Sequence, residues 1–137
     1  RFDLILRDAG LSSANFSRIK ISQGGHIEDD FEKADLVIYM GTTAAVEAGY
    51  MGIPLIHYKH PNLLTDDPLF EVSSLKKIAA TPSDLFSAIE EFGSMGSAEF
   101  KEETDSLRAY INDYLAMPSP ETTSEFHREP KTAVSVG

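Results

Sequence analysis

Cysteine is absent from this chain of 137 residues, and basic residues are scarce. Without cysteine there are no disulfide bonds and no thiolate metal ligands, which fits a cytoplasmic protein. The 12 lysine and arginine residues stand against 22 aspartate and glutamate residues, for a net charge of −10, and they form no cluster. Nucleic-acid binding requires a basic surface and is therefore not expected.

Long apolar runs are also missing, since none approaches the roughly 20 residues of a membrane-spanning helix. The chain opens on Arg-Phe-Asp, with neither an initial methionine nor the pattern of a signal peptide. We therefore expect a fragment whose N-terminal partner domain lies upstream. We further predict one folded domain over residues 1–117, followed by a disordered, proline-punctuated tail over residues 118–137.

What is present is an alternation of strand-like and helix-like segments. The predicted strands cover residues 17–22, 36–40, 53–58 and 75–80, and the predicted helices cover 26–34, 42–52, 81–93 and 97–117. This order predicts an α/β fold, an open, doubly wound parallel sheet with two helices closing its C-terminal end. Ligands of such sheets bind beyond the C-terminal ends of the strands. The rule selects the turn at Gly24-Gly25-His26, the turn at Met40-Gly41-Thr42-Thr43 and the loop that starts at His57.

The stretch "ADLVIYMGTTAAVEAGYMGIPLIHY", residues 34–58, carries the most chemistry. Gly41 lets the backbone approach a ligand closely, and the hydroxyls of Thr42 and Thr43 suit phosphate oxygens at a helix N-terminus. Glu47 follows about one turn later, and a carboxylate there can accept hydrogen bonds from both hydroxyls of a ribose. The pattern predicts a nucleoside diphosphate lying across the start of the helix.

Plain helix capping explains the same residues without a ligand. A threonine before a helix caps it, and a glutamate near the helix start is favoured by the helix dipole. The lysine of a P-loop and the three glycines of the dinucleotide fingerprint are both missing from this turn.

The same stretch resembles the C-terminal half of a GT-B glycosyltransferase. It is similar to that superfamily's order of Ala-Asp, apolar strand, Gly-[Ser/Thr], small-residue helix with Glu, Gly-x-Pro and apolar strand. With the later "DPLFE", the segment "MGTTAAVEAGYMGIPLIHY" resembles bacterial surface-carbohydrate biosynthesis proteins, and "TPSDLFSAIEEF" fits a helix common in this half. The resemblance covers roughly residues 17–117.

The resemblance implies a Rossmann-like domain that binds a nucleotide-sugar donor substrate, without a cofactor or metal. Carried over by position, Gly41, Thr42 and Thr43 would contact the diphosphate, Glu47 the ribose, and the turn at His26-Ile27 the base. The N-terminal half would supply the catalytic base and the site for the acceptor, which is a glycan or polyol. Peripheral membrane association of the full-length protein would follow from a surface-glycan acceptor. The phosphate turn lacks the basic residue that several relatives have.

The loop after residue 57 offers a second group of polar side chains. His57 and Lys59 would meet the donor sugar and the acceptor, with Lys59 offsetting diphosphate charge; the alternative is an ordinary solvated loop. A metal site from His57, His60, Asp66 and Asp67 matches no known ligand spacing.

The sequence therefore predicts the donor-binding half of an enzyme that transfers a sugar from a nucleoside diphosphate to a surface-glycan precursor. Three alternatives stay open: a UDP-N-acetylglucosamine 2-epimerase-like domain, a polyol-phosphate transferase domain and a non-catalytic α/β binding module. The epimerase is disfavoured because its Asp-Ser-Gly-Gly type turn is replaced here by Met40-Gly41-Thr42-Thr43.

Overall fold

The computed structural model describes residues 18–20, 22, 24–62 and 66–114. The chain divides into two units, Arg1–Asp35 and Leu36–Gly137, and each is described by itself. The end of the predicted domain at residue 117 and the predicted tail lie outside the described residues.

The first unit contains one short helix, α3 (Ile27–Phe31), as the acidic segment predicts. Gly24 and Gly25 both have positive φ and form the predicted turn before it. The strand predicted over residues 17–22 is wrong for the residues that are described, because 18–20 and 22 are not in a strand. Alternating isoleucines favour a strand only where a neighbour pairs with it, and Ile19 is exposed.

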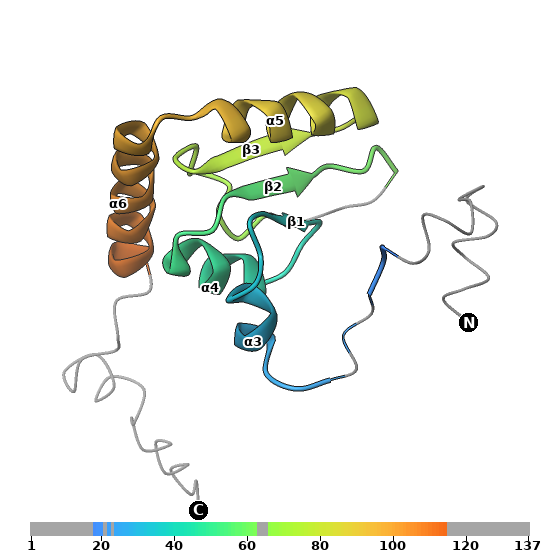
Figure 1. Ribbon diagram of the computed structural model, residues 1–137, viewed down its shortest axis with the longest axis horizontal. Coiled ribbons are helices and arrows are strands. Elements are labelled where there is room, and N and C mark those ends of the chain that lie inside the picture. The colour runs from blue at the N-terminus through green and yellow to red at the C-terminus, as the bar shows by residue number, and fades with distance from the viewer. Residues whose placement is uncertain (1–17, 21, 23, 63–65, 115–137) are drawn as a thin grey trace, which may run out of the picture. The chain divides into compact units, whose positions relative to one another are not determined.

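The second unit is built on a parallel sheet of three strands, β1 (Val37–Tyr39), β2 (Leu55–Tyr58) and β3 (Lys76–Ala79), in that order. Figure 1 shows the three strands side by side and running the same way. In the register, Tyr39, His57 and Ile78 stand next to one another at the end of the sheet where the strands finish. The α/β class with parallel strands is thus confirmed for the described part of the chain.

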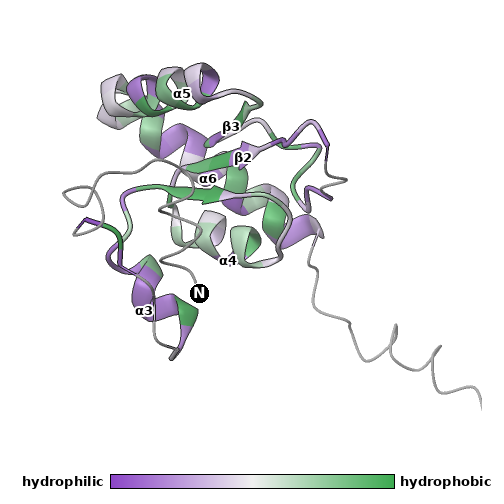
Figure 2. Cartoon of the chain, turned by 90° about the vertical axis from the view of Figure 1, so that its right-hand side faces the viewer, coloured by the Kyte–Doolittle hydropathy of each residue, from purple (hydrophilic) through white to green (hydrophobic). Residues whose placement is uncertain are grey.

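Helices cover both faces of this sheet. Helix α4 (Ala44–Met51) packs against Leu55 through Gly49, whereas α5 (Pro82–Ser94) packs against Ile56 through Ala88. Leu55 and Ile56 are successive strand residues and point to opposite faces, so the two helices lie on opposite sides. Figure 2 shows the strands between the two helices.

Local chemistry sets the end of α4 and the start of α5. Helix α4 ends at Met51 and is capped by Gly52, whose φ of 86° is the left-handed conformation that favours glycine. Helix α5 begins with a capping box, in which the Thr81 hydroxyl accepts from the Asp84 N–H and the Asp84 carboxylate accepts from the Thr81 N–H. The predicted end of this helix at residue 93 is one residue short, because the helix continues to Ser94.

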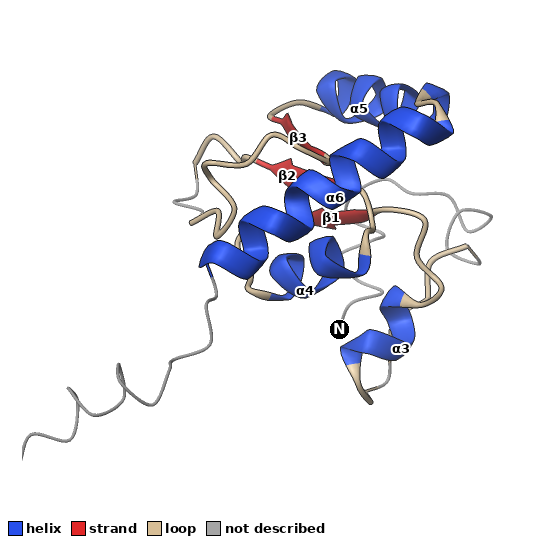
Figure 3. Ribbon diagram, turned by 90° about the vertical axis from the view of Figure 1, so that its left-hand side faces the viewer, coloured by secondary structure: helices blue, strands red, loops and turns tan. Residues whose placement is uncertain are grey.

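Helix α6 (Ser97–Tyr114) crosses the end of the sheet where the strands begin, as Figures 1 and 3 show. Leu107 and Ile111 reach the same point of α4, at Gly49. Arg108 donates to the carbonyls of Tyr50 and Met51, the last residues of α4, and Glu103 accepts from the N–H of Leu75 just before β3. Helix α6 thus covers the end where the strands begin, and the turn from β1 into α4 lies at the opposite end.

Among the helices of the described residues, none has the length and apolar character that crossing a bilayer requires.

Candidate functional site

The turn after β1 leads directly into α4. Thr42 Oγ1 accepts from the Ala44 N–H at 3.2 Å, and the N–H groups of Ala45 and Val46 bond to the carbonyls of Thr42 and Thr43. Thr43 occupies the N-cap position, yet its side chain makes no capping hydrogen bond. The two threonines therefore differ: the Thr42 side chain closes the turn, and the Thr43 side chain is exposed and does not cap the helix.

Gly41, Thr42 and Thr43 line one wall of a pocket of about 260 Å³, and Asp66, Asp67 and Pro68 line the other. The pocket lies where sequence analysis predicts the diphosphate. Its opposite wall carries two carboxylates, however, and the exposed one, Asp66, would repel a phosphate placed between the walls.

Glu47 lies on the exposed side of α4, one turn after Thr43, whereas Ala45, Val46 and Ala48 are buried. Residues four apart on a helix share a face. Thr43 and Glu47 are thus neighbours on the outer surface of α4. Glu47 lines neither of the pockets described here, so a group that it held would lie beside the helix, outside the cavity.

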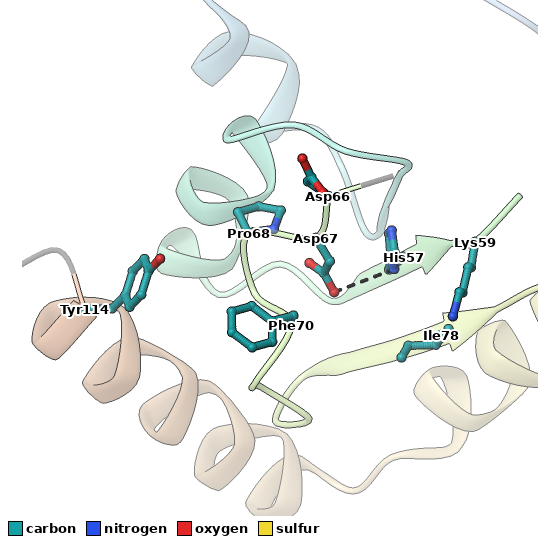
Figure 4. A pocket seen from close by; sticks show the side chains of 8 residues that line it. All are labelled: His57, Lys59, Asp66, Asp67, Pro68, Phe70, Ile78 and Tyr114. Atoms are coloured by element: carbon teal, nitrogen blue, oxygen red, sulfur yellow. Dashed lines mark ion pairs between the residues drawn. The ribbon is translucent and has the colours of Figure 1, made fainter. Parts of the chain in front are cut away.

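His57 and Lys59 line a second pocket of about 530 Å³, together with Asp66, Asp67, Pro68, Phe70, Ile78 and Tyr114. Figure 4 shows these side chains coming from β2 and β3, from the loop and from the end of α6. Because Asp66, Asp67 and Pro68 line both cavities, they form a shared wall between the two pockets.

Asp67 is the centre of a buried polar network that joins this wall to all three strands. Its carboxylate accepts from Tyr39 Oη at 2.7 Å and from Lys76 Nζ at 2.6 Å. It also accepts from the N–H of Leu69 at 2.9 Å, and Lys76 donates to the Leu69 carbonyl. The side chains of Asp67 and Lys76 are only 9% and 2% exposed. The network therefore fixes the loop of residues 66–69 across one face of the sheet.

These contacts also shift the pKa values of Asp67 and Tyr39. Burial by itself would raise the pKa of Asp67, but the hydrogen bonds from Lys76, Tyr39 and the Leu69 N–H outweigh it and hold the pKa below 3.8. Burial, followed by the bond to Asp67, raises the pKa of Tyr39 well above its ordinary value. Asp67 is therefore charged and Tyr39 neutral at pH 7.

A pH dependence of stability follows from Asp67. Its pKa is lower in the folded than in the unfolded chain, so its contribution is present above about pH 4 and is lost as the pH falls through the folded pKa. We expect Asp67→Asn to flatten the fall of the free energy of unfolding below about pH 4, measured by urea denaturation across a pH series. Asp84 and Asp105 also have lowered pKa values, but both proteins contain them, so they cancel in the comparison. Parallel pH curves would contradict the assignment.

The His57 side chain is buried and contacts other residues of the protein. Its ring is buried, lies 5.1 Å from the Tyr39 ring, and places Nε2 3.1 Å from the carbonyl oxygen of Met40. A carbonyl only accepts, so Nε2 carries a proton and donates. Nδ1 lies 3.6 Å from Asp67 Oδ2. His57 thus holds the residue just before Gly41, while Lys59 is exposed beside it and available to a ligand.

His26 and Ile27 belong to the first unit, where the His26 carbonyl accepts from the Asp29 N–H at 3.1 Å as α3 begins. Both residues are exposed. Their contact with a base remains a prediction.

No three His, Cys, Asp or Glu side chains are grouped to hold a metal ion within residues 18–20, 22, 24–62 and 66–114. Two of the four residues considered for such a site, His57 and Asp67, are instead partners in the buried network.

Sequence reasoning missed Tyr39 and Lys76 and treated Asp67 as a loop residue. One signal was available, since β3 opens with two lysines in a row and successive strand residues face opposite sides. One lysine of the pair had to enter a covered face and find an anion there.

Searches of the chain against models of protein families, curated proteins and solved structures found no match.

Proposed function

We propose that this chain is the donor-binding half of a GT-B glycosyltransferase, with a Rossmann-like domain, acting in the cytoplasm on a precursor of a surface glycan. The observation that carries the proposal is the position of Gly41-Thr42-Thr43. The turn follows β1 of a parallel sheet, opens α4 and lines a pocket. The C-terminal end of a strand and the N-terminal end of a helix meet there, as phosphate sites of α/β proteins require.

In this proposal the N–H groups of Gly41 to Thr43 and the Thr43 hydroxyl meet the diphosphate. The helical N–H groups of Ala44 to Val46 already bond within the turn. Glu47, one turn along the same exposed face, accepts from the ribose hydroxyls. Lys59, which lines the adjoining pocket, supplies a positive charge that offsets part of the charge of the leaving diphosphate.

The second half of the enzyme would supply the catalytic base and most of the acceptor site. The chain alone would then bind a donor nucleotide but transfer no sugar. Association with a membrane surface would come through the acceptor and the partner domain.

We expect the chain to bind at least one of UDP, CDP and GDP in a calorimetric titration. Thr43→Val and Glu47→Ala should each weaken that binding about tenfold or more, because each removes a hydrogen bond to a charged or polyhydroxyl group. Neither change should affect the fold, since Thr43 makes no capping bond and Glu47 is exposed.

Glu90→Ala serves as the matched control, because Glu90 is an exposed carboxylate on α5, which packs on the opposite face of the sheet from α4. It should bind nucleotide as the unchanged chain does. If none of the three nucleotides binds at millimolar concentration, the donor-site proposal fails, and a non-catalytic module becomes the better description.

A further inference from the structure

The second pocket gathers three large apolar side chains that are exposed. Phe70 is 68%, Ile78 60% and Tyr114 59% exposed, and all three line the same cavity. Single exposed apolar residues are ordinary on protein surfaces, but a group of them around one concave site indicates a binding surface. Figure 4 shows the rings of Phe70 and Tyr114 on the side toward α6.

Tyr114 is held in place by its neighbours. Its ring stacks on that of Tyr110, with centroids 5.8 Å apart and an angle of 9° between the planes. The Tyr110 hydroxyl donates to the Glu71 carboxylate at 3.3 Å, and Glu71 follows Phe70 in the loop. The contacts tie the end of α6 to the loop and present flat apolar surfaces that lose little entropy on binding.

Polar groups line the other side of the same pocket. Lys59 and Asp66 are exposed there, whereas His57 and Asp67 are engaged in the buried network. Lys59 offers donors and Asp66 offers acceptors, and their charges cancel. A ligand that suits the pocket has an apolar face, a rim of hydroxyl groups and no net charge.

We infer that this pocket binds a neutral carbohydrate of more than one ring, with C–H faces on Phe70 and Tyr114 and hydroxyls on Asp66 and Lys59. A pyranose ring has the required two-sided character, and about 530 Å³ accommodates more than one ring. Carbohydrate binding in this pocket does not depend on the donor site. Only the further role of the pocket, as an acceptor subsite in this half, rests on the proposed function. The shared wall of Asp66 to Pro68 places such a sugar next to the turn at Gly41.

The test is a titration of the ¹⁵N-labelled full chain with maltose, cellobiose and N,N′-diacetylchitobiose, each to tens of millimolar, followed by NMR. We expect saturable shifts of the Phe70, Ile78 and Tyr114 amides with at least one sugar. Phe70→Ala and Tyr114→Ala should each weaken binding about tenfold. Phe86→Ala is the matched control, because Phe86 is equally exposed at 68% but lies on α5.

Sugar binding with these amide shifts supports the inference, whether or not nucleotides bind; without nucleotide binding, only the acceptor role is lost. Absence of saturable shifts with all three sugars overturns it. Shifts of the same amides on raising protein concentration without sugar also overturn it, since they would assign the surface to a second copy of the chain. Equal loss of binding in Phe86→Ala would place the sugar elsewhere and overturn it too.

Discussion

Asp67→Ala should lower the free energy of unfolding by about 3–5 kcal/mol, the usual cost of removing one partner of a buried ion pair. The Lys76 ammonium group is 2% exposed, and after the substitution it keeps only the Leu69 carbonyl as a partner within this network. It also takes the acceptor from the Tyr39 hydroxyl and the Leu69 N–H. Urea denaturation followed by circular dichroism measures the loss.

Asp66→Ala is the control for this prediction, because Asp66 is the preceding carboxylate and is exposed. Its effect should stay within about 0.5 kcal/mol. Replacing both partners, as Asp67→Leu with Lys76→Met, should recover part of the loss, since no charge is then buried alone, while the Tyr39 hydroxyl and the Leu69 N–H still lack their acceptor. Equal effects of the two alanine variants would show that the network does not stabilise the fold. The double variant keeps the test informative if Asp67→Ala does not fold.

Leu107→Ala should cost about 2–5 kcal/mol, because Leu107 is fully buried where α6 meets α4 and the sheet. A Cβ on Gly49 would lie 3.0 Å from Leu107 Cδ2 and 3.2 Å from Leu55 Cδ1, which shows how tightly the three elements pack. Leu85→Ala, on the half-buried face of α5, should cost less. Thermal and urea unfolding of both variants measure the difference.

A double-mutant cycle makes this prediction sharper. Gly49→Ala alone should destabilise by about 1–3 kcal/mol through overpacking. In the Leu107→Ala background the same change should cost less, because the 3.0 Å contact with Leu107 is removed while the 3.2 Å contact with Leu55 remains. Gly93→Ala, where a Cβ would meet nothing within 4 Å, should be neutral or stabilising. If Gly49→Ala costs the same in both backgrounds, α6 does not pack on α4 as described.

Local sequence signals were enough for most elements of the second unit. Apolar runs such as "LVIY" and "PLIHY", rich in branched residues and bounded by glycine or proline, are typical of strands covered on both faces, and Thr81, Pro82 and Asp84 fix where α5 begins. The strand expected at residues 17–22 is not formed by residues 18–20 and 22, because two alternating isoleucines in the sequence do not specify a partner strand. Strand order and register likewise depend on contacts between distant segments, which one sequence does not state.

The candidate site likewise has one part that the sequence predicts and one part that depends on tertiary contacts. The sequence by itself determined that a glycine-threonine turn connects an apolar strand to a small-residue helix, and so placed Gly41, Thr42 and Thr43 at one point. Only the tertiary structure decided what faces that turn. Asp67 is 28 residues from Tyr39 along the chain, and Lys76 lies nine residues further on. The fold nevertheless brings the three side chains together where the loop of residues 66–69 meets the parallel sheet. The turn forms from neighbours in the chain, so its residues are visible locally. The wall opposite forms because burying the Lys76 ammonium group requires an anion, and which carboxylate supplies it depends on the folded path of the loop.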